Sequence, residues 1–416
     1  MTANVRIFGM PAERGRWVFV ALGFVMNICM GSIYAYSIFK PFIEREFDVS
    51  PLASAIPFML FSAFFAFLMF FGGKFMEIMG PRYLSIVGGV IMAIGWMLAS
   101  YASNAFMLAV SYGVIGGAGV GLAYGCPIAI AAHWFPDRTE LAANIMLAGF
   151  GGSAVITGTA AMLLIDRAGV TGVFMNFGIT FLVVLFAVSL PLRFPAPGWR
   201  PAGWAPADIS GNDVDFDSHE MIRTASFWGL SLCVIIGCTA GLMAICIAVP
   251  AGMELAGLDF GVAAALVGLF SAFNALGRIL FGALSDRTAP RRGAMINFAI
   301  VLGACALMVA PIGADTARYI IAFCALWLTL GGWLAIAPAA TASFFGIRHY
   351  AKNYGVIFFA YGIGAVLGGA IGGASQLLFG SYRFAFHPVL ALAALGIVLA
   401  ALLITPPRTR RIDGPR

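Results

Sequence analysis

Twelve long runs of apolar residues, each about twenty residues in length, dominate this chain of 416 residues. A run of that length matches the ~20 residues that an α-helix needs to cross the ~30 Å hydrocarbon core of a membrane. Spanning strands would instead show short segments of alternating polarity. The composition agrees, because 61% hydrophobic and 10% charged residues lie far from the roughly 45–50% and 25% of soluble domains. The runs therefore predict a polytopic, all-α membrane protein.

The predicted spans form two groups of six. The first group is 17–39, 52–71, 83–101, 106–132, 141–165 and 173–192, and the second is 227–251, 262–284, 294–312, 319–340, 354–379 and 384–404. A polar stretch rich in Pro, Trp and Asp lies between the groups and predicts a linker at 193–224. We expect an N-terminal bundle (1–192) and a C-terminal bundle (225–416). A short interfacial helix, capped by Asp217 or Ser218, is expected at the end of the linker.

An internal repeat relates the two groups. The same spacing of glycine, acid, proline and arginine follows the second span and the eighth span, displaced by 209 residues: Gly73, Glu77, Pro81 and Arg82, then Gly282, Asp286, Pro290 and Arg291. Phe135 with Arg138 and Phe345 with Arg348 repeat at a displacement of 210 residues. Repeats nearly half a chain apart are typical of transporters built from two parallel bundles. We therefore predict twelve transmembrane helices in two parallel six-helix repeats.

The basic residues predict the orientation. With the N-terminus in the cytoplasm, 18 of the 24 Lys and Arg residues fall on the cytoplasmic side, and Lys40, Arg45, Arg167, Arg318 and Arg383 fall outside. The positive-inside rule then assigns both termini to the cytoplasm. The net charge of +6 reports this orientation, so no nucleic-acid partner is expected. The seven cysteines all fall inside predicted spans, which indicates buried small side chains rather than disulfides or a metal site.

These motifs resemble the major facilitator superfamily. The repeated Gly-x-x-x-Asp-Arg-x-x-x-Arg loop is similar to that family's signature, and the resemblance implies its fold and a cytoplasmic latch between the halves. The second copy is the better match, with Asp286, Arg287 and Arg291, whereas the first carries Glu77 and Arg82 but has Ile78 where a base is usual. We expect the second copy to be the stronger latch, and solvated loop charges are the alternative.

A narrower resemblance covers most of the chain. The segment from Gly119 to Pro127, the run Trp134-Phe-Pro-Asp-Arg138, the glycines of 149–152 and Asn353-Tyr-Gly355 are similar to the monocarboxylate transporters and the oxalate/formate antiporters. The acidic-glycine motif of the animal carriers is not visible, so the bacterial branch fits better. The resemblance implies an integral inner-membrane protein of a prokaryote.

Arg278 is the charged residue that no loop or helix end accommodates. It lies about two-thirds of the way along the eighth span, where an arginine costs roughly 2.5–3.5 kcal/mol on insertion scales. A guanidinium stays charged and can hold a carboxylate through two hydrogen bonds. We expect Arg278 to bind the carboxylate of the substrate, a role that the resemblance also implies. A structural arginine, bonded to carbonyls or snorkelling, is the alternative.

Two departures from the related carriers bear on the substrate. Asn274 stands where the animal carriers have an aspartate, one turn before Arg278, and an amide cannot titrate. Tyr361 stands where dianion-exchanging relatives have a lysine. One fixed cation therefore faces the cavity, which favours a monocarboxylate such as lactate, pyruvate or acetate over oxalate.

The remaining site residues are inferred from their places on the helices. Tyr34, Tyr124, Trp333, Asn274 and Tyr361 could complete the carboxylate shell and contact a short alkyl chain; ordinary packing is the alternative for such aromatic residues. Asp259 and His387, at the rim, are the proton-coupling candidates beside the substrate itself.

The sequence thus predicts a secondary active transporter of small monocarboxylates, coupled to protons and working by alternating access. An organic anion antiporter of the oxalate/formate type is the alternative. A membrane enzyme is not expected, because the spans carry no HExxH, GxSxG or paired carboxylates. We expect no cofactor, a monomer, and the lipid bilayer, the anion and the proton as partners.

Overall fold

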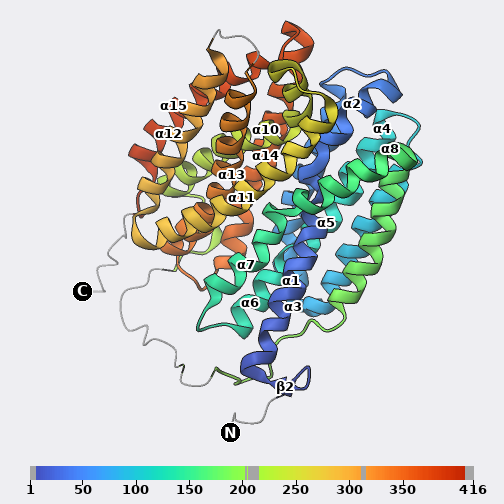
Figure 1. The fold of residues 1–416 in the computed structure, drawn as a ribbon. Helices are drawn as coiled ribbons and strands as arrows, with labels where there is room; N and C mark the ends of the chain where they lie inside the picture. The colour runs from blue at the N-terminus through green and yellow to red at the C-terminus, as the bar shows by residue number, and fades with distance from the viewer. Residues whose placement is uncertain (1–5, 202–203, 205–214, 311–314, 408–416) are drawn as a thin grey trace.

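The computed structural model describes residues 6–201, 204, 215–310 and 315–407, and these residues are almost entirely helical (Figure 1). We refer to the helices before residue 190 as the N-terminal half: α1 (Ala12–Met30), η1 (Gly31–Ala35), α2 (Tyr36–Phe47), η2 (Ala53–Ala55), α3 (Ile56–Ala99), α4 (Ala105–Leu108), η3 (Ala109–Gly116), α5 (Gly117–Ala123), α6 (Gly125–Trp134), α7 (Thr139–Gly151) and α8 (Ser153–Ser189). The C-terminal half is α10 (Ala225–Ala256), α11 (Phe260–Arg287), α12 (Pro290–Val309), α13 (Thr316–Phe345), α14 (Tyr350–Phe379), η4 (Tyr382–Ala385) and α15 (Phe386–Leu403).

Ten continuous helical segments of the described chain are long and apolar enough to cross a membrane. Two of them are far longer than one crossing requires: Ala53–Ala99 with 47 residues and Thr139–Ser189 with 51 residues. Each is interrupted by a glycine with positive φ, 71° at Gly80 in α3 and 65° at Gly169 in α8. A residue with a Cβ atom adopts that conformation only at a steric cost, so glycine turns the chain there. Two crossings in each of these segments account for twelve.

Three of the crossings are broken near their middles. The first crossing passes through the 3₁₀ segment η1 between α1 and α2, and the fifth is interrupted at Gly152 between α7 and α8. In the fourth crossing, α5 and α6 are separated at Tyr124, three residues before Pro127. Proline has no N–H to donate to the carbonyl four residues earlier, which explains the local loss of helical hydrogen bonding. Interrupted helices at mid-membrane depth are where transporters of this architecture build binding sites.

The linker ends in the short helix α9 (Ser218–Met221), as the sequence predicts. Asp217 is its N-cap: the Asp217 carboxylate accepts a hydrogen bond from the Glu220 N–H at 2.8 Å, and Glu220 returns one to the Asp217 N–H at 3.0 Å. This reciprocal capping box confirms the predicted start of the helix. The Phe216 N–H donates to the carbonyl of Phe345 at 3.0 Å, so the end of the linker is fastened to the C-terminal half.

The described part of the chain begins with a two-residue antiparallel pair, β1 (Arg6–Ile7) and β2 (Met10–Pro11), which the sequence did not predict. Beside it, Arg16 in α1 donates to both carboxylate oxygens of Asp137, at 2.5 and 2.8 Å, and to the Trp134 carbonyl at 3.0 Å. These hydrogen bonds hold the pKa of Asp137 below its usual 3.8. The ion pair between Arg16 and Asp137 ties the first helix to the α6–α7 turn within the N-terminal half.

Lys40 corrects one expectation from the sequence. We assigned it to the outer side, just beyond a first span ending at residue 39, whereas the structure places it inside α2, 0% exposed. The helix continues past the predicted end of the first span because Lys40 is neutralised one turn later by Glu44, at 2.5 Å. An (i, i+4) partner lets a lysine remain within a buried helix.

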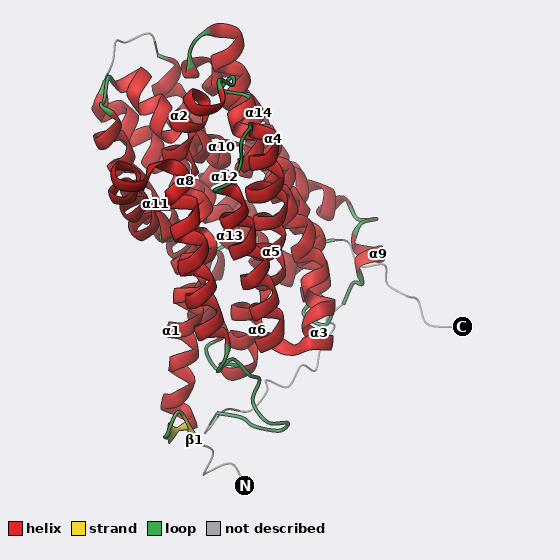
Figure 2. Cartoon of the chain, turned by 90° about the vertical axis from the view of Figure 1, so that its right-hand side faces the viewer, coloured by secondary structure: helices red, strands yellow, loops and turns green. Residues whose placement is uncertain are grey.

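The two halves lie side by side along their length (Figures 1 and 2). They meet where α3 packs on α14, where α7 and α8 pack on α11, and where α2 packs on α10. Gly362 brings α14 against α3, since a Cβ atom there would lie 2.9 Å from the Ala66 methyl group. The interface between the halves therefore contains the breaks in the first and fifth crossings.

Candidate functional site

Arg278 lies in α11 at the interface between the two halves, with only 2% of its surface exposed. None of its three side-chain nitrogens, Nε, Nη1 and Nη2, has a hydrogen-bond partner, and no carboxylate of the described residues forms an ion pair with it. The guanidinium carbon lies 5.8 Å from the centre of the Phe150 ring. A buried, unsatisfied guanidinium is costly, because up to five N–H donors lack acceptors.

The backbone of α11 is held firmly at this point. A Cβ atom on Gly331 of α13 would lie 2.0 Å from the Asn274 carbonyl, and one on Gly277 would lie 2.0 Å from the Leu328 carbonyl. Only glycine permits this approach of α11 to α13, a typical use of small residues between membrane helices. The close contact between α11 and α13 fixes the position of the Arg278 backbone.

Aromatic rings surround the guanidinium from both halves. Three tyrosines predicted from the sequence are brought together here: Tyr34 on η1, Tyr124 at the α5–α6 break and Tyr361 on α14. Tyr34 and Tyr124 each pack edge-on against Phe150, at 5.2 and 5.3 Å between ring centres. The hydroxyl groups of Tyr34 and Tyr361 are buried without a hydrogen-bond partner. We call Arg278 and these rings the arginine cluster.

Asn274 is one helical turn from Arg278 and joins the same cluster. Its amide Nδ2 donates to the Trp327 carbonyl at 3.0 Å, while its Oδ1 is buried with no partner. The Oδ1 atom points toward the break in the fifth crossing, since a Cβ atom on Gly151 would lie 2.8 Å from it. The cluster thus offers the free guanidinium donors, two free tyrosine hydroxyls and one free amide oxygen.

The sequence reasoning missed three rings of the cluster: Phe65, Phe150 and Trp327. Phe65 contacts Tyr124, Phe358 and Tyr361 at ring-centre distances of 5.0, 5.2 and 5.5 Å, and Trp327 contacts Tyr34 at 5.9 Å. Phe150 had one usable signal, its place between Gly149 and the break at Gly151 and Gly152. Phe65 and Trp327 had none, because phenylalanines fill α3 and nothing local distinguishes the tryptophan.

Three predicted residues lie apart from the cluster. Trp333 is buried beside Phe298 of α12, at 5.0 Å between rings, and against Gly237 of α10. Asp259 caps α11, where its carboxylate accepts from the Val262 N–H at 3.1 Å. His387, in the first turn of α15, stacks on Phe384 of η4 at 5.7 Å between ring centres.

The predicted latch residues lie at the turns that follow the second and eighth crossings. Glu77 and Arg82 flank the Gly80 kink, and neither takes part in an ion pair among the described residues. The Asp286 side chain lies outside the described ones. Arg287 and Arg291 line a groove of about 800 Å³ at the α11–α12 turn. The ion pairing of the latch therefore remains a prediction.

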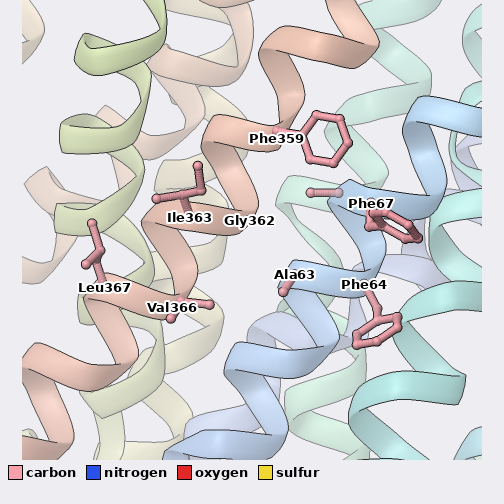
Figure 3. Close-up of a pocket in the computed structure, with 9 residues that line it drawn as sticks. Ala63, Phe64, Phe67, Phe359, Gly362, Ile363, Val366 and Leu367 are labelled. Carbon is pink, nitrogen blue, oxygen red and sulfur yellow. The ribbon is translucent and has the colours of Figure 1, made fainter.

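A groove of about 470 Å³ lies between α3 and α14 (Figure 3). Figure 3 shows Phe64 and Phe67 of α3 opposite Phe359 and Ile363 of α14. Every residue that lines the groove is apolar, so it has no group to hold a carboxylate. The arginine cluster remains the site with the chemistry for an anion.

Comparison with protein families gives one match that spans most of the chain. The profile of the Major Facilitator Superfamily matches residues 20–343. The oxalate:formate antiporter of Oxalobacter formigenes is 29% identical over 395 residues, which are 94% of this chain and 91% of that protein. Monocarboxylate transporter 12-B of Danio rerio is 23% identical over 427 aligned positions, covering 95% and 87% of the two chains.

Solved structures show the same fold. A bacterial homologue of the human lysosomal transporter Spinster, in an inward-facing and unoccupied conformation, aligns with a TM-score of 0.72 and 17% identity. The alignment covers 94% of this chain and 98% of that chain. The likeness therefore extends over both halves.

Proposed function

Because this chain belongs to the Major Facilitator Superfamily, whose members are membrane transporters, we propose that it carries small monocarboxylates across the membrane, coupled to protons, by alternating access. Arg278 binds the substrate carboxylate in this proposal. The inner membrane of a prokaryote is the proposed location. Both chain ends are assigned to the cytoplasm, because 18 of the 24 basic residues then lie on that side.

One observation carries the proposal: Arg278 is buried among aromatic rings with all three of its side-chain nitrogens unpartnered. A carboxylate would satisfy two of them at once through the parallel N–H···O bonds that guanidinium groups form best. The free hydroxyl groups of Tyr34 and Tyr361 can donate to the same carboxylate. Binding would neutralise the buried cation, which lowers the cost of passing through a state closed to water on both sides.

The number of fixed charges supports a monoanion. Arg278 is the cation of the arginine cluster, and the ring contacts of Tyr361 with Phe65 and Phe358 fill the place where dianion-exchanging relatives have a lysine. One positive charge balances one carboxylate, and a second carboxylate would be buried without a partner. Phe150, Phe65 and Trp327 supply apolar surface that suits a short alkyl chain.

Coupling to a proton follows from the same charge balance. Moving a lone anion across a membrane at 100 mV changes its energy by about 2.3 kcal/mol, and a proton that travels with it cancels this term. The proton-coupling candidates Asp259 and His387 are engaged away from the cluster, as an N-cap and in a ring stack. The third candidate, the substrate entering as its acid, would have to give up its proton before its carboxylate pairs with Arg278, so this proposal assigns the proton to no single group.

Exchange of organic anions is the second candidate, favoured by the relative named an oxalate:formate antiporter, which aligns with 94% of this chain. In this reading a second anion returns through the same site and no proton is needed. Arg278 would hold each anion in turn.

Uptake of labelled lactate into proteoliposomes tests both candidates. Symport requires faster uptake with an inward proton gradient than without one, and equal rates would remove the coupling. Exchange requires uptake that is stimulated by preloaded anion and indifferent to pH. Arg278→Gln should abolish either activity, and full transport by this variant would refute the proposed binding site.

A further inference from the structure

Three side-chain hydrogen bonds join the two halves within the described residues, and one of them involves a charge. Two are made by Ser271 of α11 near mid-membrane, to the Gly151 carbonyl at 2.7 Å and from the Ala154 N–H at 3.1 Å. The third runs from the Lys40 ammonium of α2 to the hydroxyl of Tyr382 in η4, at 3.2 Å. The four ion pairs among the described residues all lie inside the N-terminal half.

Lys40 lies above the arginine cluster on the same crossing. It follows Tyr34 by six positions, about 9 Å along a helix at 1.5 Å per residue. It is 0% exposed, and α2, which carries it, is labelled at the upper end of the molecule in Figure 1. This end is opposite the β1–β2 hairpin, and the orientation proposed above makes it the outer end. The Lys40–Tyr382 contact therefore lies between the halves on the outer side of the arginine cluster.

Both partners of this contact are held in place from their own half. Glu44 accepts from Lys40 at 2.5 Å and from the Ser54 hydroxyl at 2.7 Å, so the lysine is neutralised from within the N-terminal half. On the other side, Glu254 of α10 accepts from the Tyr382 N–H at 3.1 Å and from the Ser381 hydroxyl at 2.5 Å. Within this network, one hydrogen bond crosses between the halves, from Lys40 to Tyr382.

This arrangement suits a contact that must open and close. Breaking a buried ion pair leaves an uncompensated charge, but here the pair stays intact in one half when the halves separate. The bond that breaks joins an ammonium to a neutral hydroxyl, and water can replace each partner. Apolar pairs around it, such as Phe42 of α2 with Phe260 of α11 at 5.0 Å between rings, exclude water when the halves meet.

We propose that Lys40, Glu44 and Tyr382 form the outer gate of the substrate path. Lys40 and Tyr382 close it by pairing across the halves, and Glu44 keeps Lys40 neutralised while the gate is open. The inference rests on the proposed function for the direction of the path, and not for the identity of the substrate.

Distances between spin labels at the outer ends of the two halves test the gate directly. Tyr101, 68% exposed, and Phe379, 62% exposed, accept labels after substitution by cysteine, and the seven native cysteines are buried. In lipid nanodiscs, Tyr382→Phe should raise the population with the long distance about tenfold, equivalent to about 1.4 kcal/mol. The phenyl ring keeps the packing and removes the hydroxyl alone, so the melting temperature should not fall.

Ser54→Ala is the matched control. It also removes a hydroxyl from the network around Glu44, but Ser54 bonds only within its own half, so the distance distribution should stay that of the wild type. A second variant, Lys40→Met with Glu44→Gln, removes the charge pair as a neutral unit and should open the outer end as Tyr382→Phe does.

The outcome is independent of the substrate. Unchanged distances in Tyr382→Phe and in the double variant would overturn the gate even if lactate is transported. A shift in both variants supports the gate even if lactate uptake fails, and that failure would refute only the proposed substrate. An equal shift in Ser54→Ala would also overturn the gate, since the effect would then come from the N-terminal half itself.

Discussion

Replacing Arg278 by glutamine should separate stability from ligand binding in a way that a structural arginine would not. Arg278 has three unpartnered nitrogens in a buried site, so in the unliganded protein no hydrogen bond or ion pair among the described residues offsets the burial of its charge. Insertion scales set the cost of an arginine at membrane depth at about 2.5–3.5 kcal/mol. We therefore expect unliganded Arg278→Gln to melt at a temperature no lower than the wild type.

The effect on binding should be large and opposite. A carboxylate held by two charge-assisted hydrogen bonds, each worth about 1.5–3 kcal/mol, would retain one neutral bond to glutamine at about 1 kcal/mol. A net loss of about 3 kcal/mol weakens binding roughly 150-fold. The assay is thermal unfolding in detergent with lactate titrated over four decades, read as the ligand-dependent rise in melting temperature, which should disappear in the variant.

Arg16→Gln is the matched control, because Arg16 is also buried but donates two hydrogen bonds to Asp137. This variant should lower the melting temperature and keep the lactate-dependent rise. The reasoning about Arg278 fails if Arg278→Gln behaves like Arg16→Gln, destabilised and still responsive to lactate. Such a result would identify Arg278 as a structural residue.

Three further predictions follow from the geometry. Tyr361→Lys should weaken lactate binding and introduce oxalate binding, measured by the same thermal titration; unchanged responses to both anions would contradict the charge count. Gly331→Ala should lower the free energy of unfolding by about 1–3 kcal/mol or more, because its Cβ would lie 2.0 Å from a carbonyl oxygen of α11. Gly303→Ala is the control, since a Cβ there has nothing within 4 Å, and it should leave the stability unchanged. Equal melting temperatures of the two variants would refute the close approach. Asp137→Asn should destabilise at pH 6, and the difference from wild type should shrink as the pH falls below 3.8 through the lowered pKa of Asp137; a difference that stays constant down to pH 3 would contradict the ion pair.

The membrane crossings and the buried cation Arg278 could be predicted from the sequence for one reason. A membrane interior penalises every charge, so Arg278 is conspicuous among apolar residues without any knowledge of its neighbours. The turn between the second and third crossings is also a local feature, because Gly80 adopts the positive φ that only glycine tolerates easily. The N-cap at Asp217 is likewise a property of a few adjacent residues.

Contacts between residues far apart in the chain could not be predicted from the sequence. Lys40 was assigned to the outer side beyond the first span, because no local pattern reveals that Tyr382, 342 positions away, accepts its hydrogen bond. Phe65 and Trp327 were missed, and spacing did not show that Trp333 packs against Phe298. Aromatic residues are so frequent in these helices that spacing alone cannot tell packing from lining.

The sequence by itself determined that this protein crosses the membrane many times in two repeated halves, with one arginine that must be explained. Hydrophobicity and repetition are local properties, and a single chain displays them. Only the tertiary structure decided which side chains surround Arg278, that its guanidinium has no partner among the described residues, and that a buried lysine connects the halves at one end. Those facts depend on how helices from opposite halves face one another, and that arrangement is set by packing between residues far apart in the chain.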